Sequence, residues 1–411
     1  MYQKEKQSRI SVTKRKDCPM TKTQIQLIAL VRCALGDRIL PTELRDLSLD
    51  EKTAIIQYAR KQGLLPFLQY FDIFMREDCR EIFFPYVAAA VYEDVRQTAE
   101  IDRLLEAFEE NGIYCMPLKG IRTKKLYPAS ELRTMGDLDI LYRKEQTDEL
   151  RRVMQKLGYT WSGEASKHDH YEKDRRIVEM HKEMLPAESR AYRHFLDIWD
   201  RARPESGKKY CYQMSLEDHY LFTLYHLIEH FIRGGIGIRM VLDIYILSEL
   251  PELDNEKVAA ELEKLGIDEF EKNIRDLAQR WFSQPLQSQQ DAAGQKDNIE
   301  PDSLAELEEY IVNGGIFGNT VNEQTNNALR YGSKAKYLRN VIFPSYKTMQ
   351  SVFPWLNSPL LLPAAWVNRW WNVWTKRRGN IRGQFERADK ISLQDKLYID
   401  EQKKFFSRYG L

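Results

Sequence analysis

The stretch Met135-Gly136-Asp137-Leu138-Asp139-Ile140-Leu141 decides the fold, because two aspartates one residue apart begin an apolar run. Successive side chains of a strand point to opposite faces of the sheet, so Asp137 and Asp139 are expected on one face. Two carboxylates about 7 Å apart repel each other, and one should keep its proton unless a cation lies between them. Paired divalent cations on carboxylates are a usual apparatus for attack on a phosphate. Two exposed acids at a solvated strand end are the alternative.

An apolar run over residues 113–118 ends upstream in Lys119-Gly120, and residues 121–127 are expected to form a helix. A strand that delivers a glycine to a helix N-terminus places backbone N–H groups where a phosphate could bind. Lys119 would add a positive charge there. Most Lys-Gly pairs are ordinary turns, so this pair alone is not specific.

A second acidic strand is expected downstream. Residues 145–158 predict an amphipathic helix, with Gly158 at the C′ position. Residues 175–181 follow as a strand on which Glu179 and His181 share one face. Glu179 is therefore a candidate third carboxylate, and these segments together indicate a compact phosphoryl-transfer core.

The motifs around the aspartates have a characteristic order and spacing. They are Leu118-Lys119-Gly120, Tyr127-Pro128, Arg133, Gly136-Asp137-Leu138-Asp139-Ile140-Leu141, Leu157-Gly158-Tyr159 and Val178-Glu179-Met180-His181. In this order they resemble the bacterial nucleotidyltransferases of the polymerase-β superfamily, and in particular a poorly characterised group known as nucleotidyltransferase family proteins. The likeness continues through residues 224–230, 239–244 and 314–318, and covers roughly residues 100 to 320.

The resemblance implies an α+β fold: a small mixed-sheet nucleotidyltransferase core flanked by N- and C-terminal helical regions. It assigns metal binding to Asp137 and Asp139, and it makes Glu179 the third acidic position, which commonly helps to activate the attacking hydroxyl. Gly120 matches the glycine that lets the triphosphate approach the backbone. The implied cofactor is Mg²⁺ or Mn²⁺, as two ions, with a nucleoside triphosphate such as ATP as substrate.

Basic side chains near the acids are candidates for nucleotide binding. Lys119 and Arg133 are interpreted in this way, whereas Arg122, Lys124 and Lys125 are expected on the solvated face of a short helix. His181 is a further nucleotide-binding candidate that could order the acidic cluster or contact the acceptor, and a plain buried histidine explains it nearly as well. Arg239 and Asp243, four residues apart on an expected helix, could form a salt bridge or indicate that the helical half faces the site.

Two departures from the family pattern bear on activity. Many members have Gly-Ser or Gly-Gly at the phosphate turn, where Lys119-Gly120 is followed by Ile121 in this chain. The superfamily often has Asp at the third acidic position, so Glu179 could bind metal or only accept a proton. A catalytically weak nucleotide-binding regulator is therefore the alternative to an enzyme.

The reaction that the resemblance implies is displacement at the α-phosphorus of a nucleoside triphosphate. The NMP group would move to an unidentified acceptor, which could be a small molecule, a sugar, a tRNA or a protein, and pyrophosphate would be released. Positioning and charge stabilisation supply most of the acceleration in phosphoryl transfer.

Bulk properties limit the partners. The chain has 411 residues, 30% of them charged, and a net charge of +1. No charge excess indicates a nucleic-acid partner, although a local basic patch would still allow one. The five scattered cysteines favour reduced thiols and a cytoplasmic protein, and the polar N-terminus has no apolar signal region.

We expect five segments along the chain. They are a flexible tail (1–19), an N-terminal helical region (20–95), the nucleotidyltransferase core (96–213), a helical domain with a surface loop at 284–302 (214–335), and a tryptophan-rich C-terminal region (336–411). His226 and His230 in the helical domain have zinc-ligand spacing, but hydrogen-bonded or core histidines are favoured because no further ligand motif accompanies them.

The C-terminal region concentrates five tryptophans, at positions 355, 366, 370, 371 and 374, before the basic run 376–378. It could lie on a membrane surface, as in an accessory protein of a biosynthetic cluster. A lid or helix packed on the core is favoured instead. Prolines 354, 359 and 363 leave no apolar run long enough to span a bilayer.

Overall fold

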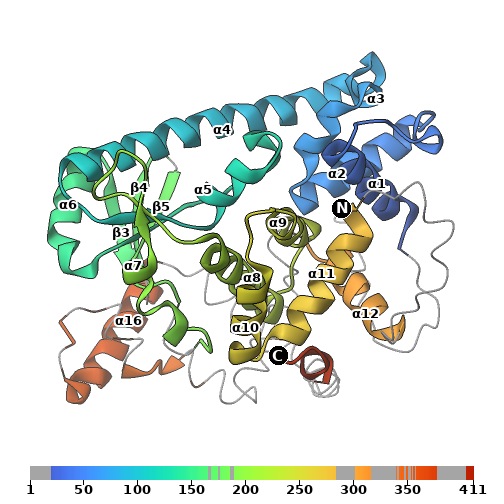
Figure 1. Cartoon of the computed structure of the whole chain (residues 1–411). Coiled ribbons are helices and arrows are strands. Elements are labelled where there is room, and N and C mark those ends of the chain that lie inside the picture. Colours follow the sequence, from blue (N-terminus) through green and yellow to red (C-terminus); the bar gives the residue numbers. More distant parts are fainter. Residues whose placement is uncertain are drawn as a thin grey trace.

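A long helix, α4 (Glu77–Glu110), joins the N-terminal helices to a β-sheet and runs along one side of the molecule (Figure 1). The computed structural model describes residues 20–164, 168–174, 176–185, 189–283 and 301–315, parts of 339–376, and 404–411. The helices before α4 are α1 (Lys22–Leu35), α2 (Leu49–Gln62) and α3 (Asp72–Met75). The expected tail, 1–19, lies outside the described residues.

Local signals set several helix ends. The Ser48 side chain accepts a hydrogen bond from the Glu51 N–H, and the Glu51 side chain bonds back to the Ser48 N–H, which forms a capping box at the start of α2. Gly63 ends that helix at φ 67°, a conformation that glycine adopts without steric cost. Helix α6 (Thr147–Lys156) is followed by Gly158 at φ 83°, which confirms the predicted C′ position.

The sheet is mixed, with the strand order β1-β2-β5-β4-β3. Its strands are β1 (Cys115–Pro117), β2 (Leu138–Tyr142), β3 (Thr160–Glu164), β4 (His168–Lys173) and β5 (Arg176–His181). Only the central pair, β2 and β5, is parallel among these neighbours, and the others are antiparallel. Two short strands, β6 (Arg203–Pro204) and β7 (Tyr212–Gln213), form a separate hairpin.

One face of the sheet is apolar and covered by helices. Leu138 and Ile140 of β2 and Val178 and Met180 of β5 pack in one cluster with the second half of α4 and with α6. Strand alternation therefore turns the residues between them, Asp139 and Glu179 among others, toward the opposite side. Leu141 of β2 packs there with side chains of the C-terminal helices.

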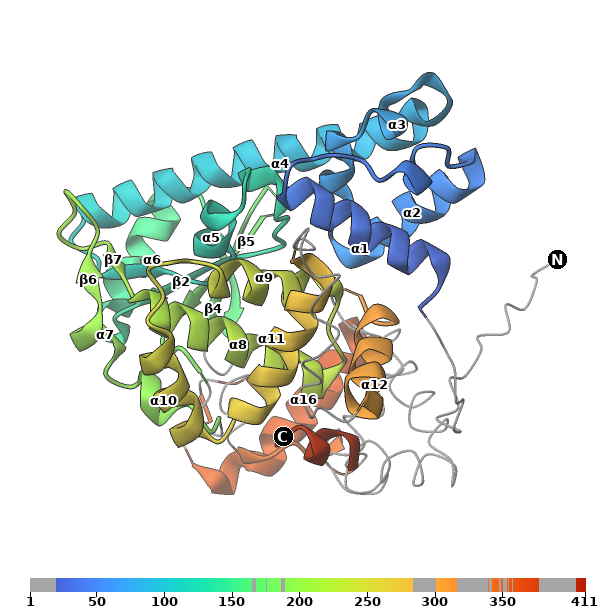
Figure 2. The same cartoon turned by 45° about the vertical axis from the view of Figure 1, so that its right-hand side comes forward.

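The remaining helices follow the sheet in the chain. They are α5 (Lys119–Thr123), between β1 and β2, and then α7 (Ile198–Arg201), α8 (Leu216–Arg233), α9 (Ile238–Ser248), α10 (Asn255–Leu265), α11 (Asp268–Phe282), α12 (Pro301–Val312) and α16 (Leu362–Lys376). Figure 2 shows α8 to α11 gathered below α4 and beside α1. Buried side chains of α1, α2, α8, α9 and α11 belong to one hydrophobic cluster.

The α+β fold with a mixed sheet is confirmed, while the five segment boundaries stay predictions. The two helical regions predicted as separate segments share the cluster just described, and Arg32 donates to the carbonyl of Trp281 at 2.7 Å. Residues 284–300 of the predicted surface loop lie outside the described part, and α12 begins at Pro301.

The tryptophan-rich region is partly described. Trp366 packs with Met349, Leu356 and Ala365 in a small cluster of their own, whereas Trp371 is 63% exposed. Residues 377–378 of the basic run and the side chains of Trp374 and Lys376 lie outside the described part. Among the described helices, none is both long and apolar enough to cross a bilayer. Cys33, Cys79, Cys115 and Cys211 are free thiols.

Candidate active site

Three carboxylates meet on the face of the sheet opposite α4 and α6. The parallel register of β2 and β5 pairs Asp139 with Glu179, and Asp137 lies directly before β2. One oxygen of each carboxylate lies within 4.8 Å of an oxygen of the other two. The acids that the sequence placed on one face are therefore brought together.

Lys119 reaches the centre of this cluster. Its Nζ lies 2.8 Å from Oδ1 of Asp139, and both side chains are largely buried. The backbone N–H of Leu118 donates to the Asp139 carbonyl at 2.9 Å, so the turn after β1 lies beside β2. Lys119 has φ 40°, a left-handed conformation that costs a non-glycine residue about 1–3 kcal/mol. The surrounding contacts hold this conformation in place.

His181 approaches the same aspartate from β5. Its Nε2 lies 2.8 Å from Oδ1 of Asp139 and 3.4 Å from Oε2 of Glu179, and its ring is fully buried. Lys119 and His181 thus both contact Oδ1 of Asp139. The interpretation that His181 orders the acidic cluster agrees with this position.

The pKa values of the two aspartates are shifted in opposite directions. Desolvation raises the pKa of Asp137, and the negative charges of Asp139 and Glu179 raise it further. Burial alone would also raise the pKa of Asp139, but Lys119 and His181 outweigh it and hold this pKa well below its ordinary value. Contacts with His181 and His168 likewise lower the pKa of Glu179 against the desolvation that opposes them. The pKa of Asp137 is therefore raised by burial and by its acidic neighbours, while Lys119 and His181 hold Asp139 ionised.

Gly120 and Arg133 lie against each other beside this cluster. A Cβ on Gly120 would come within 2.5 Å of Sδ of Met135 and 2.6 Å of Nη1 of Arg133, so any other residue there would displace these two side chains. Arg133 is buried and donates from Nε and Nη2 to both carboxylate oxygens of Asp243, at 2.8 and 2.9 Å. Nη1 is the nitrogen left facing the glycine turn. A nucleotide-binding role for Arg133 stays a prediction.

Helix α9 also contacts the loop that carries the aspartates. Arg239 donates to the Thr134 carbonyl at 2.8 Å, and Asp243 binds Arg133 and the Tyr127 hydroxyl. Of the two alternatives, the salt bridge between Arg239 and Asp243 is therefore wrong, since the Asp243 carboxylate pairs with Arg133, which is far away in sequence. The second interpretation, that the helical half faces the site, agrees with these contacts.

The short helix after the Gly120 turn and the histidine pair of α8 also differ in burial from exposed surface. Lys125 is exposed as expected, but Lys124 is buried and forms an ion pair with Asp94 of α4, so it is not on a solvated face. His226 and His230 meet edge to face with ring centroids 4.4 Å apart. Burial lowers the pKa of His230 to about 4, assisted by Lys119 and Arg233.

The donor chemistry of the acidic cluster fits a hard divalent cation. Three carboxylates converge, and Mg²⁺ and Mn²⁺ prefer oxygen ligands of this kind. The Lys119 ammonium on Asp139 already balances part of the negative charge. A cation bound there would share Asp139 with it.

Two histidines of β4 extend the polar face, and sequence reasoning did not assign them to the site. His168 pairs with His181 and His170 with Glu179 in the antiparallel register of β4 and β5. The available signal is the same alternation that places Glu179 and His181 together.

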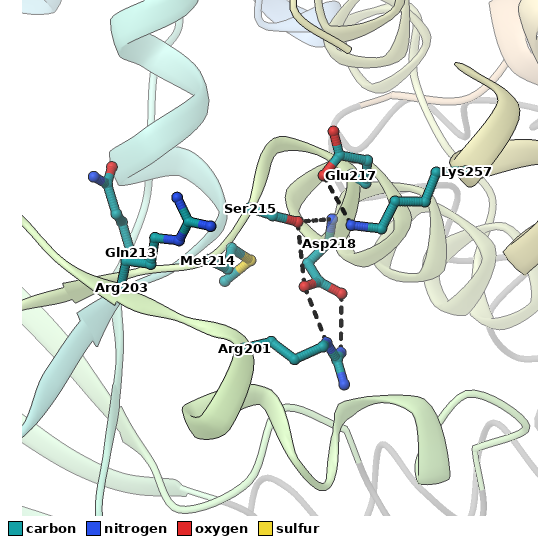
Figure 3. A pocket seen from close by; sticks show the side chains of 8 residues that line it. All are labelled: Arg201, Arg203, Gln213, Met214, Ser215, Glu217, Asp218 and Lys257. Carbon is teal, nitrogen blue, oxygen red and sulfur yellow. Dashed lines mark hydrogen bonds and ion pairs between the residues drawn. The ribbon is translucent and has the colours of Figure 1, made fainter. Parts of the chain in front are cut away.

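A cavity of about 420 Å³ lies elsewhere, between the β6–β7 hairpin, the start of α8 and α10. Figure 3 shows that its charged side chains are largely engaged with one another. Arg201 contacts Asp218 at 2.9 Å, and Lys257 contacts Glu217 at 3.5 Å. None of the acids of the cluster lines this cavity, so it does not mark the candidate site.

Comparisons with known proteins identify a family. Residues 50–283 match the model of a family described as uncharacterised nucleotidyltransferase. The solution structure of the antibiotic-resistance factor ANT(2″)-Ia is 14% identical, with a TM-score of 0.32 over 42% of this chain and 93% of that one. A crystal structure of ANT(2″)-Ia in complex with adenylyl-2″-tobramycin is 13% identical, with a TM-score of 0.31 over 41% and 97%. Comparison with curated proteins finds no match.

Proposed function

Because this chain belongs to a family of uncharacterised nucleotidyltransferases, we propose that it transfers a nucleoside monophosphate from a nucleoside triphosphate to an acceptor hydroxyl. The observation that supports this reaction is the convergence of Asp137, Asp139 and Glu179 beside Lys119. The acceptor oxygen bonds to the α-phosphorus as the bond to the bridging oxygen breaks, and pyrophosphate leaves. The hydroxyl proton passes to a carboxylate of the cluster, for which Glu179 is the candidate.

The three carboxylates would hold the divalent cations, as two Mg²⁺ or Mn²⁺ ions. When bound, such ions lower the pKa of the acceptor hydroxyl and neutralise charge on the triphosphate. Asp139 is suited to this role because Lys119 and His181 keep it ionised. Desolvation and the neighbouring carboxylates raise the pKa of Asp137, and a bound cation would lower it.

The basic groups of the site would bind the triphosphate. Lys119 lies where it can carry positive charge to a phosphate beside Asp139. Nη1 of Arg133, left over from the contact with Asp243, faces the Gly120 turn and is the nitrogen that could reach a phosphate oxygen. His181 would act by holding Asp139 in place.

The test is pyrophosphate release from a panel of nucleoside triphosphates and acceptors with Mg²⁺ or Mn²⁺. The variant carrying Asp137→Asn and Asp139→Asn should release none and remain folded by circular dichroism. Asp148→Asn, which changes an exposed aspartate of α6, is the matched control and should retain the native rate. Release at the native rate from the double variant contradicts the proposed mechanism.

A nucleotide-binding regulator with weak catalysis is the second candidate. The ion pair of Lys119 with Asp139 favours it, because the ammonium occupies one side of the carboxylate that would hold a cation. Calorimetry separates the two candidates: a regulator binds a triphosphate tightly, yet releases no pyrophosphate with any acceptor of the panel.

A further inference from the structure

The polar face of the sheet carries a second group of potential ligands beside the acidic cluster. His181 and Glu179 of β5 stand opposite His168 and His170 of β4. His168 is 13% exposed, Glu179 16% and His181 0%, so the backbones of two paired strands and the surrounding protein hold these side chains in place.

Distances within this group suit a single bound ion. Nε2 of His168 lies 3.6 Å from Oε2 of Glu179, and Nε2 of His181 lies 3.4 Å from the same oxygen. One ligand atom from each of the three residues lies within 4.8 Å of the other two. With metal–ligand bonds of about 2.1 Å, neighbouring ligands of a tetrahedral ion are about 3.4 Å apart, so two edges of a site are already close to their final length.

The chemistry of the donors selects the kind of ion. Two imidazole nitrogens and one carboxylate oxygen suit Zn²⁺ and similar transition metals, whereas Mg²⁺ prefers oxygen alone. We propose that His168, Glu179 and His181 bind a divalent transition-metal ion of the Zn²⁺ class, beside the all-carboxylate group of Asp137, Asp139 and Glu179. A water or a substrate atom would complete the coordination.

The two groups share Glu179 and meet at Asp139. A metal on Nε2 of His181 takes the nitrogen that now lies 2.8 Å from Asp139, so Asp139 would give up that contact. Asp137 contributes only to the carboxylate group, and His168 only to the histidine group. The inference therefore goes beyond nucleotidyl transfer and does not depend on it.

The competing explanation is that protonated histidines simply neutralise Glu179. His170 provides a matched control for this alternative. Its ring stacks on that of His168 with centroids 4.6 Å apart, and its Nε2 lies 3.4 Å from Oε1 of Glu179. Its side chain is more exposed than that of His168, at 36% against 13%, but it has a similar carboxylate contact and is outside the proposed ligand set.

Co²⁺ is the spectroscopic probe, and Zn²⁺ competition against it gives the affinity. The full-length protein should bind one Co²⁺ with visible d–d absorption bands, and Zn²⁺ should displace it. His168→Gln should weaken Zn²⁺ binding at least tenfold and change the bands, whereas His170→Gln should stay within twofold of the native affinity. Thermal unfolding of each variant verifies that it is folded.

Two results would overturn the assignment. One is a folded His168→Gln variant that binds Zn²⁺ as tightly as the native protein does. A native protein that binds no Zn²⁺ counts equally against the assignment. The other is loss in His170→Gln with none in His168→Gln. Asp137→Asn separates this inference from the proposed function, because it should lose pyrophosphate release and keep the Co²⁺ spectrum. If no variant or native protein releases pyrophosphate, the Co²⁺ result still stands on its own.

Discussion

The two faces of the central strand pair carry different kinds of side chain, although the same two strands supply both. On one face, Ile140 and Met180 are fully buried against α4 and α6. On the other, Asp139 and Glu179 meet Lys119 and His181. Since strand side chains alternate, one-residue steps separate packing from chemistry. The difference teaches that activity and stability should respond to neighbouring substitutions independently.

The largest expected effect is on activity, from the polar face. Asp139→Asn removes the charge that Lys119 and His181 surround, and with it a ligand proposed for the cations. Pyrophosphate release should fall at least a hundredfold, which corresponds to about 2.7 kcal/mol of transition-state stabilisation. Steady-state release at saturating triphosphate measures it. A rate within threefold of the native rate would mean that this face is not the catalytic one.

The next effect is on stability, from the opposite face of the same strand. Ile140→Ala leaves a cavity among fully buried neighbours and should lower the free energy of unfolding by about 2–4 kcal/mol. Urea denaturation measures the change, and pyrophosphate release per folded molecule should stay within twofold. Ile177→Ala on β5, where the side chain is 43% exposed, is the control and should cost well under half as much. Equal losses from both would contradict the division between the faces.

Short-range alternation accounts for the part of the site that the sequence predicts. The pattern around Asp139 and the pattern around Glu179 each place one acid on a known face of its own strand. The family resemblance then brings the two strands together, and the structure pairs these residues in register. Gly158 is predicted for a similar local reason, because a helix end needs a left-handed residue.

The ion pairs that surround the acidic cluster could not be predicted from strand alternation. Lys119 and Asp139 are 20 residues apart, and Arg133 and Asp243 are 110 apart. No local period links such positions, so only the packing of α5 and α9 on the sheet reveals them. The buried position of Lys124 beside Asp94 has the same cause, since a charged residue in a short helix ordinarily indicates solvent.

The pH dependence of stability tests the burial of His219, which lies on α8 and contacts α5. His219 of α8 is buried with Nε2 3.1 Å from Oγ1 of Thr123, and burial together with Arg122 lowers its pKa to about 3. The folded protein therefore keeps it neutral, while the unfolded chain protonates it below its ordinary pKa of about 6.5. The contribution of neutral His219 to the free energy of unfolding is therefore complete above pH 6.5. It should fall by about 1.4 kcal/mol per pH unit as the pH drops from there toward 3.

Denaturation of the native protein and of His219→Gln at pH 7, 6 and 5 measures this contribution. The difference in unfolding free energy between them should shrink as the pH falls, because only the native protein loses this term. His230 titrates in both proteins and so cancels. A difference that is constant with pH would show that folding does not lower the pKa of His219.

The smallest expected effect is that of a substitution at the exposed end of the polar face, outside the candidate site. Glu172 of β4 shares a face with His168 and His170, pairs with Ile177 and is exposed. Ile177 and Glu179 are two positions apart on the strand, or about 7 Å, and an exposed charge interacts only weakly over that distance through water. Glu172→Gln should therefore change the unfolding free energy by less than about 0.5 kcal/mol.

Pyrophosphate release and Zn²⁺ affinity should likewise stay within twofold in this variant. A fivefold change in either would extend the site to the end of β4 and make the whole polar face, rather than its buried half, the functional surface. The larger effect of Asp139→Asn would then reflect only its position on one extended polar surface, and not its contacts within the buried acidic cluster. Burial, more than the acidic character that both residues share, is what separates them.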